Sequence, residues 1–142
     1  MRIYIAAPLF NESEKKRNLE FKQFLEELGH ETYLPQLDGG VAFDLISAGG
    51  NDAREVRKRI FQNDLREIRK CDLLFCVLDG RVPDEGVCIE IGMAHALGKI
   101  CLGYKTDQRS FDKHGDNLMI EGCLSGIVAS SEELKAALKI KK

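Results

Sequence analysis

The chain has 142 residues, which is long enough for one domain, spanning residues 1–142, to bury a core without disulfide bonds. Hydrophobic residues make up 44% of it and charged residues 31%, proportions that are ordinary for a soluble globular protein. The formal net charge of −2 gives no reason to expect a nucleic acid or an anionic membrane as partner.

The cysteines and histidines do not form a metal-binding pattern. The five cysteines are odd in number and include no C-x-x-C pair, and the three histidines are scattered along the chain. Small buried thiols are the simpler interpretation of the cysteines in apolar runs. The N-terminal MRIYIAAPLF lacks the long apolar core of a signal peptide, and no run is long enough to cross a bilayer. We therefore expect a cytoplasmic protein with no metal site.

Expected strands and helices alternate along the chain. Short apolar or β-rich runs predict strands at residues 2–8, 31–35, 72–80, 99–105 and 126–130. Helices are predicted from the Asn11 cap to about residue 29, from 51 to 70, from 84 to 97, and from 130 to 139, where Ser130 and Glu133 stand at capping-box spacing. Residues 36–50 hold four glycines and predict a long loop, which in a compact domain is usually functional or mobile.

This alternation predicts an α/β fold with a parallel sheet, right-handed crossovers and helices on both faces. Five strands favour the flavodoxin-like (Rossmann-like) order 2-1-3-4-5. Ligands of such sheets bind beyond the carboxyl ends of the strands, at the crevice between strands 1 and 3. The loops after Ala7 and Asp79 are therefore expected to flank a site.

The segment DGRVPDEGVCIEIGMAHALGK, residues 79–99, places a carboxylate inside an apolar helix. At about 100° per residue, the polar side of this helix carries Glu85, Cys88, Gly92, His95 and Lys99. Glu90 lies roughly opposite the centre of that side and so points inward, whereas most glutamates in helices are exposed. Burial of an unpaired ionised carboxylate costs several kcal/mol unless it is hydrogen-bonded or changes its pKa. Proteins tolerate that cost where the chemistry of a site needs it.

A second inward acid lies on the preceding helix. Asp64 occupies the apolar row that also holds Val56, Ile60 and Ile68. A single buried acid can be a structural hydrogen-bonding group, but two on helices that flank one crevice favour a site. Asp84 is a third acid, at the start of the third helix, where capping the helix and binding a ligand are compatible roles.

Other site patterns are missing from the sequence. No G-x-x-x-x-G-K-[ST], no G-x-G-x-x-G and no serine nucleophile elbow occurs. The remaining alternative to an enzyme is a flavodoxin-like binding or signalling module. That alternative would explain a strand-end aspartate such as Asp79, but not Glu90 and Asp64 within apolar faces.

Four segments together resemble the nucleoside 2-deoxyribosyltransferase family. They are RIYIAAPLF at 2–10, QNDL at 62–65, DEGVCIEIGMAHALGK at 84–99 and NLM at 117–119. The resemblance runs from about residue 2 to 125. Its most specific part is an acid six residues before a helix glutamate, followed by E-x-G-x-A-x-A-x-G-K.

The resemblance implies a role for each matching residue. Glu90 would be the nucleophile that attacks the anomeric carbon of a 2′-deoxynucleoside, Tyr4 would orient it, and Asp64 would exchange a proton with the base. The implied substrate-binding residues are Asp84 and Asn117 at the sugar, with Asn117 supplied by a neighbouring subunit, together with Phe10, Gln36, Gly86 and Met119. Where this chain has Ala7-Pro8-Leu9, some family members carry glycine and tryptophan.

The resemblance further implies an enzyme of nucleotide salvage that exchanges the bases of 2′-deoxynucleosides with retention of configuration at the anomeric carbon. It also implies that the enzyme needs no cofactor and works as a homo-oligomer, either a dimer or a hexamer. Its substrates would be 2′-deoxynucleosides and free purine or pyrimidine bases. The alternative is a 2′-deoxynucleoside 5′-monophosphate N-glycosidase, which would share Glu90 and Asp64. Such hydrolases resemble one another in using serine where this chain has Asp84 and Asn117, so the sequence favours the uncharged 5′-hydroxyl.

Overall fold

A computed structural model describes residues 1–40, 52–109 and 115–139 and contains one five-stranded parallel sheet. The strand order is β2-β1-β3-β4-β5, so the predicted order 2-1-3-4-5 and the α/β fold are confirmed. The strands are β1 (Arg2–Ala6), β2 (Glu31–Tyr33), β3 (Leu73–Val77), β4 (Ile100–Tyr104) and β5 (Gly126–Val128). All four neighbouring pairs are parallel, which requires a crossover connection between each strand and the next.

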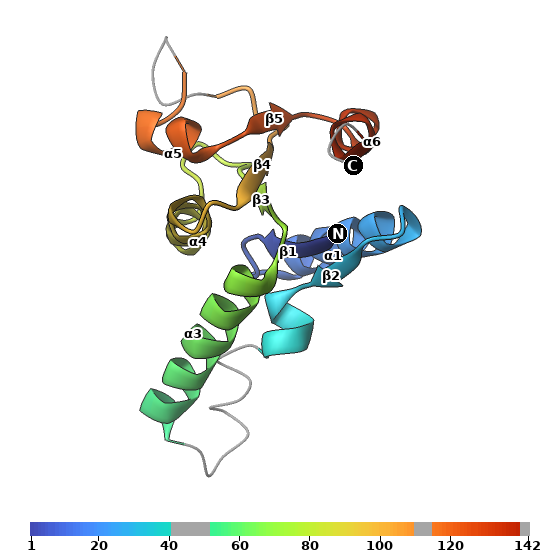
Figure 1. Cartoon of the computed structure of the whole chain (residues 1–142). Helices are drawn as coiled ribbons and strands as arrows, with labels where there is room; N and C mark the ends of the chain where they lie inside the picture. The colour runs from blue at the N-terminus through green and yellow to red at the C-terminus, as the bar shows by residue number, and fades with distance from the viewer. Residues whose placement is uncertain (41–51, 110–114, 140–142) are drawn as a thin grey trace.

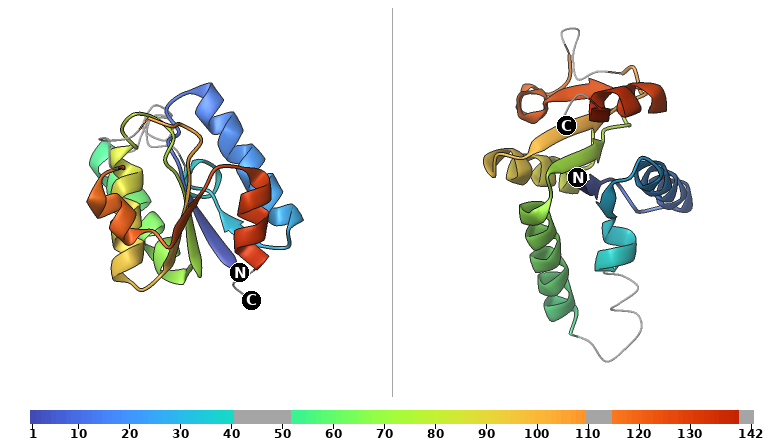
Figure 2. Two further views of the ribbon diagram at one scale, coloured as in Figure 1. Left: turned by 90° about the horizontal axis from the view of Figure 1, so that it is seen from above. Right: turned by 45° about the vertical axis from the view of Figure 1, so that its right-hand side comes forward.

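Helices cover both faces of this sheet (Figures 1 and 2). They are α1 (Glu12–Glu27), α3 (Ala53–Lys70), α4 (Glu85–Ala96), α5 (Leu118–Cys123) and α6 (Ser131–Lys139), and a short π-helix, η1 (Pro35–Gly39), follows β2. One face packs against α1 and α6, and the other against α3, α4 and α5. In the described part of the chain, no helix is both long and apolar enough to cross a membrane.

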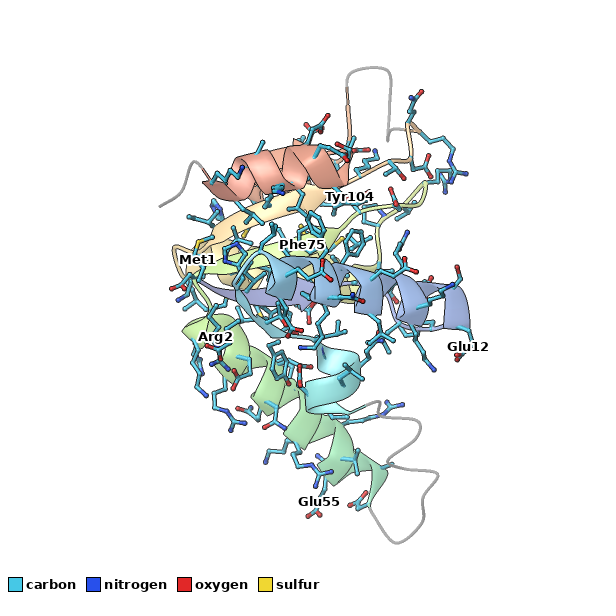
Figure 3. The ribbon with its side chains drawn as sticks, turned by 90° about the vertical axis from the view of Figure 1, so that its right-hand side faces the viewer. Met1, Arg2, Glu12, Glu55, Phe75 and Tyr104 are labelled. Carbon is cyan, nitrogen blue, oxygen red and sulfur yellow. The ribbon has the colours of Figure 1, made fainter. Side chains whose placement is uncertain are left out.

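Two hydrophobic cores result from the two-residue period of the strands. On β1, Ile3 and Ile5 point into the core beneath α1 and α6, whereas Tyr4 and Ala6 point into the core beneath α3 and α4. Phe75 and Tyr104 lie together on the α1 and α6 side, with their ring centroids 6.1 Å apart (Figure 3). This alternation places the Tyr4 side chain on the face where the two predicted acids lie.

Local capping signals fix several helix boundaries. Asn11 and Glu14 form a capping box at the start of α1, and the Glu133 N–H donates to Ser130 Oγ at the start of α6, as the sequence predicts. Helix α3 begins after Asp52, whose side chain accepts from the Arg54 N–H, rather than at residue 51. Residue 51 lies outside the described residues.

One expectation for the irregular segments was wrong, and one helix was not predicted. Part of the predicted loop 36–50 is helical, because η1 extends to Gly39, and residues 41–50 lie outside the described part of the chain. The segment after residue 115 also contains a helix, α5, which the sequence analysis did not predict. Asn117 caps α5 by accepting a hydrogen bond from the Met119 N–H at 3.0 Å.

Candidate active site

Glu90 lies on α4 with its carboxylate in a cleft at the carboxyl end of the sheet. The Asp84 side chain starts this helix by accepting from the Val87 N–H at 2.9 Å, which fixes the first turn. One and a half turns later, Glu90 is half-buried, and the Tyr4 hydroxyl donates to its Oε1 at 2.6 Å. A short hydrogen bond from a fully buried ring holds the carboxylate in one orientation.

The surroundings of Glu90 favour its neutral form. Burial raises the pKa of Glu90 to about 8, the hydrogen bond from Tyr4 opposes this rise, and the negative charges of Asp64 and Asp84 add to it. Burial and the charge of Glu90 also raise the pKa of Tyr4, so this hydroxyl remains a hydrogen-bond donor at neutral pH.

Asp64 enters the same cleft from α3. Val56 and Ile68 on the same row are buried, and Asp64 is half-buried, as the helical period predicts. The Tyr33 hydroxyl donates to Asp64 Oδ1 at 3.2 Å. Burial raises the pKa of Asp64 to about 6, although the hydrogen bond from Tyr33 lowers it. A carboxyl group with a pKa of that size can both donate and accept a proton near neutral pH.

The cleft that holds these acids has a volume of about 210 Å³. It lies between the segment after β1, η1 and the facing sides of α3 and α4. Its lining residues are Ala7, Leu9, Phe10, Pro35, Gly40, Ile60, Asp64, Asp84, Gly86, Val87 and Glu90. Five predicted site residues therefore line one cleft: Glu90, Asp64, Asp84, Phe10 and Gly86. Tyr4 is not among the lining residues, and its hydroxyl contacts the cleft by donating a hydrogen bond to Glu90.

Phe10 and Gly86 differ in how they border the cleft. The Phe10 ring is 75% exposed, so it forms a rim rather than a wall. A Cβ on Gly86 would lie 3.0 Å from Asp84 Oδ1, which is tighter than most side chains tolerate. A larger residue at position 86 would therefore displace the Asp84 carboxylate.

Gln36 does not line the cleft. Its side-chain amide nitrogen donates to the Lys15 carbonyl at 3.0 Å, and its oxygen accepts from Asn18 Nδ2 at 2.9 Å. The fully buried Asn18 also donates to the Pro8 carbonyl at 2.8 Å. Gln36 and Asn18 thus connect η1 and the segment after β1, which both border the cleft, to α1. The substrate-binding role implied for Gln36 remains a prediction.

Asn117 and Met119 lie in a second, larger cavity of about 610 Å³ between α4 and α5. The wall of this cavity is mostly apolar and includes Val82 and Ile89, which are 63% and 58% exposed. Within one chain, the structure therefore does not bring Asn117 together with Glu90. In the described residues, no group of three or more histidine, cysteine, aspartate or glutamate side chains is placed to hold a metal ion.

Sequence reasoning missed Tyr33 and Asn18, both of which support the cleft. Tyr33 is 8% exposed and Asn18 is fully buried. A buried asparagine on the apolar side of α1 is a signal that helical periodicity could have identified. Tyr33 could have been found only from strand register, because its neighbour across the sheet is Tyr4.

The chain matches one protein family over nearly its whole length. The family model described as nucleoside 2-deoxyribosyltransferase matches residues 3–138. No curated protein sequence gives a significant match.

Solved structures of other proteins share this fold. A 2-deoxyribosyltransferase from the psychrotolerant bacterium Bacillus psychrosaccharolyticus is 28% identical over 95% of this chain and 90% of its own, with a TM-score of 0.78. A conserved protein from Enterococcus faecalis V583 is 26% identical over 100% of this chain and 99% of its own, with a TM-score of 0.80. A CMP N-glycosidase from Clostridium botulinum is 23% identical over 100% of both chains, with a TM-score of 0.64. At that identity the last likeness concerns the fold alone.

Proposed function

The chain belongs to the nucleoside 2-deoxyribosyltransferase family, whose members are enzymes, and from this premise we propose that it transfers a 2-deoxyribosyl group between nucleobases. The observation that carries the proposal is the Glu90 carboxylate in the cleft, held by the Tyr4 hydroxyl at 2.6 Å, with Asp64 lining the same cleft from α3. A binding module has no need to bury two acids at such a cost.

In the proposed first half-reaction, a Glu90 oxygen attacks the anomeric carbon of a bound 2′-deoxynucleoside. The bond from that carbon to the base nitrogen breaks, its electron pair stays on the nitrogen, and Asp64 supplies the proton that neutralises it. The product is an ester between Glu90 and the sugar. The negative carboxylate also stabilises the oxocarbenium-like transition state before the bond is complete.

The second half-reaction reverses these steps with another base. The incoming nitrogen attacks the anomeric carbon, Asp64 takes the proton from that nitrogen, and Glu90 leaves as a free carboxylate. Two inversions give net retention, as in retaining glycosidases. Every step uses side chains of the cleft, so the proposal includes no metal and no organic cofactor.

This chemistry defines the pH range of activity. The reactive form of the free enzyme carries one proton on the pair, on Asp64, while Glu90 is ionised. It is the minor of the two singly protonated forms, because Glu90 has the higher pKa. Below a pH of about 6 both acids hold a proton, and above about 8 neither does. We expect a bell-shaped dependence of kcat/KM on pH with limbs near these values, which belong to the pair as a whole.

We propose that Asp84 recognises the sugar. One of its oxygens caps α4, and the other accepts a hydrogen bond from the 5′-hydroxyl. A 5′-phosphate in that place would meet like charge, because two unit charges about 4 Å apart repel by about 4 kcal/mol at an effective dielectric near 20. Because solvent and bound cations reduce this repulsion, we expect a preference of about 100-fold in kcat/KM for nucleosides over nucleotides.

The position of Asn117 supports a site completed by a second copy of the chain. Asn117 lies outside the Glu90 cleft, at the start of α5, beside the exposed apolar residues of the larger cavity. We propose that a second copy of the chain covers this apolar surface and that the Asn117 of one subunit completes the cleft of another. We therefore propose at least a dimer.

The test of the function incubates the protein with 2′-deoxyinosine, with and without adenine, and with 2′-deoxyadenosine 5′-monophosphate, followed by chromatography of the products. The proposal predicts 2′-deoxyadenosine and hypoxanthine in the presence of adenine, and little cleavage of the nucleotide. Faster cleavage of the monophosphate than of the nucleoside would instead assign the N-glycosidase function.

A further inference from the structure

Two tyrosines stand side by side beneath the two acids. Tyr4 of β1 and Tyr33 of β2 are register partners on neighbouring parallel strands. Their rings stack, with centroids 5.5 Å apart and an interplanar angle of 23°, and both are buried. The Tyr4 hydroxyl donates to Glu90 and the Tyr33 hydroxyl to Asp64, so each tyrosine holds a different carboxylate.

The backbone of η1 closes over the second of these contacts. Figure 1 shows this short helix, drawn in cyan after β2, beside α3. A Cβ on Gly39, its last residue, would lie 2.8 Å from the Tyr33 hydroxyl oxygen and 3.2 Å from Asp64 Oδ1. Because the Tyr33 ring is buried and stacked on Tyr4, its hydroxyl cannot move aside freely. Glycine at position 39 therefore allows η1 to pack against this pair.

On the premise of the proposed function, we propose that Tyr33 is a positioning residue, which fixes the Asp64 carboxyl group for proton exchange with the base as Tyr4 fixes Glu90. The contact gives Asp64 a donor that is present in both half-reactions. Burial and the charge of Asp64 raise the pKa of Tyr33, so its hydroxyl keeps its proton and acts by hydrogen bonding.

The donor is needed because Asp64 must be ionised when it receives a proton from the incoming base. Burial alone favours its neutral form, and the Tyr33 hydrogen bond stabilises the ionised form. The other titratable groups facing this pair are Tyr4 on β1, Glu90 on α4, Asp38 on η1 and Glu67 on α3. The hydrogen bond to the Asp64 carboxylate comes from Tyr33, whereas the Tyr4 hydroxyl donates to Glu90.

The three tyrosines of the chain provide a matched test. In Tyr33→Phe the ionised form of Asp64 loses its donor, so the acid limb of the kcat/KM profile should move up by about one pH unit. In Tyr4→Phe the alkaline limb should move up instead, because the ionised form of Glu90 loses its donor. Tyr104→Phe, in the opposite core, should move neither limb.

Gly39→Ala tests the same contact with Tyr33 in place. The added methyl group must separate the hydroxyl from Asp64, so the acid limb should again move up. Gly122→Ala is its control, because a Cβ at position 122 meets nothing within 4 Å. A folded Tyr33→Phe or Gly39→Ala variant whose acid limb stays at the wild-type pH overturns the proposal.

A measurement on the resting protein separates this proposal from the proposed function. Carbon-13 NMR titration of the aspartate side chains should show a higher pKa for Asp64 in Tyr33→Phe than in the wild type. If that pKa rises and the wild type turns over no substrate, the proposed effect of Tyr33 on Asp64 is confirmed and the proposed function is wrong. If turnover is normal and the pKa of Asp64 is unchanged, the role of Tyr33 is wrong.

Discussion

Replacing Asp64 by asparagine should convert the bell-shaped pH profile into a single rising limb. In the wild type the two limbs come from a pair of acids whose pKa values are about 6 and about 8. Asparagine does not titrate, so only the ionisation of Glu90 remains. The charge of Asp64 is one cause of the high pKa of Glu90. The remaining limb should therefore have its midpoint below 8.

The size of the loss follows from the proton that Asp64 supplies. A positioned general acid contributes about 100-fold to 10,000-fold, so the barrier should rise by about 3 to 5 kcal/mol. Initial rates of 2′-deoxyinosine cleavage between about pH 5 and pH 9 measure both effects.

A control variant removes a carboxylate elsewhere. Asp107→Asn, on the loop after β4, should keep both limbs and nearly the wild-type rate. An Asp64→Asn enzyme that still loses activity on the alkaline side with a midpoint near 8 would refute the assignment of Asp64 as the acid.

Three further predictions concern Glu90, Asp84 and Asn117. Glu90→Gln should leave less than about a tenth of the wild-type rate, equal to a barrier rise of more than about 1.4 kcal/mol. The free energy of unfolding of this variant should also rise relative to the wild type between pH 4.5 and about 8, by at most about 1.4 kcal/mol per pH unit. In that range Glu90 ionises in the unfolded wild type but stays protonated in the folded one, which destabilises the wild type only. Urea unfolding at several pH values measures this difference. Asp84→Ser should reduce nucleoside turnover and narrow the roughly 100-fold gap to the monophosphate, measured as a ratio of kcat/KM values. Mixing inactive Glu90→Ala and Asn117→Ala subunits should restore some activity if Asn117 acts across an interface, and an active monomer in sedimentation would contradict this.

Local signals were sufficient to predict the fold and the two inward acids. The strand order follows from the alternation of apolar runs with helices, because right-handed crossovers allow only a few arrangements of the strands in the sheet. Helical periodicity alone placed Glu90 and Asp64 toward the sheet, and both line the cleft. Such positions are predictable because they depend on residues a few places apart in the chain.

Contacts between distant segments could not be predicted in this way. The Tyr33 contact with Asp64 depends on the register of β2 and on η1, neither of which has a periodic signal. The sequence analysis identified Asp79 only as a strand-end aspartate. In the structure its carboxylate accepts from the Thr106 N–H at 2.6 Å and pairs with Arg17 at 3.2 Å, which ties β3 to α1 and the segment after β4.

The short helix α5 escaped prediction for a different reason. It has only six residues, too few for a hydrophobic period to emerge. Its start is marked by the Asn117 cap, but the sequence analysis interpreted Asn117 only as a sugar-binding residue. A capping role and a ligand-binding role are compatible, as they are for Asp84.

The covalent intermediate on Glu90 is the central claim, and mass spectrometry of the quenched enzyme tests it most directly. Wild-type protein is mixed with 2′-deoxyinosine in the absence of an acceptor base, quenched with acid during turnover and digested. The account predicts that the peptide containing residues 85–97 gains the mass of one deoxyribosyl group, and that Glu90→Gln protein gains none. Base exchange at the full rate with that peptide unmodified, or an adduct on another residue, would contradict the account.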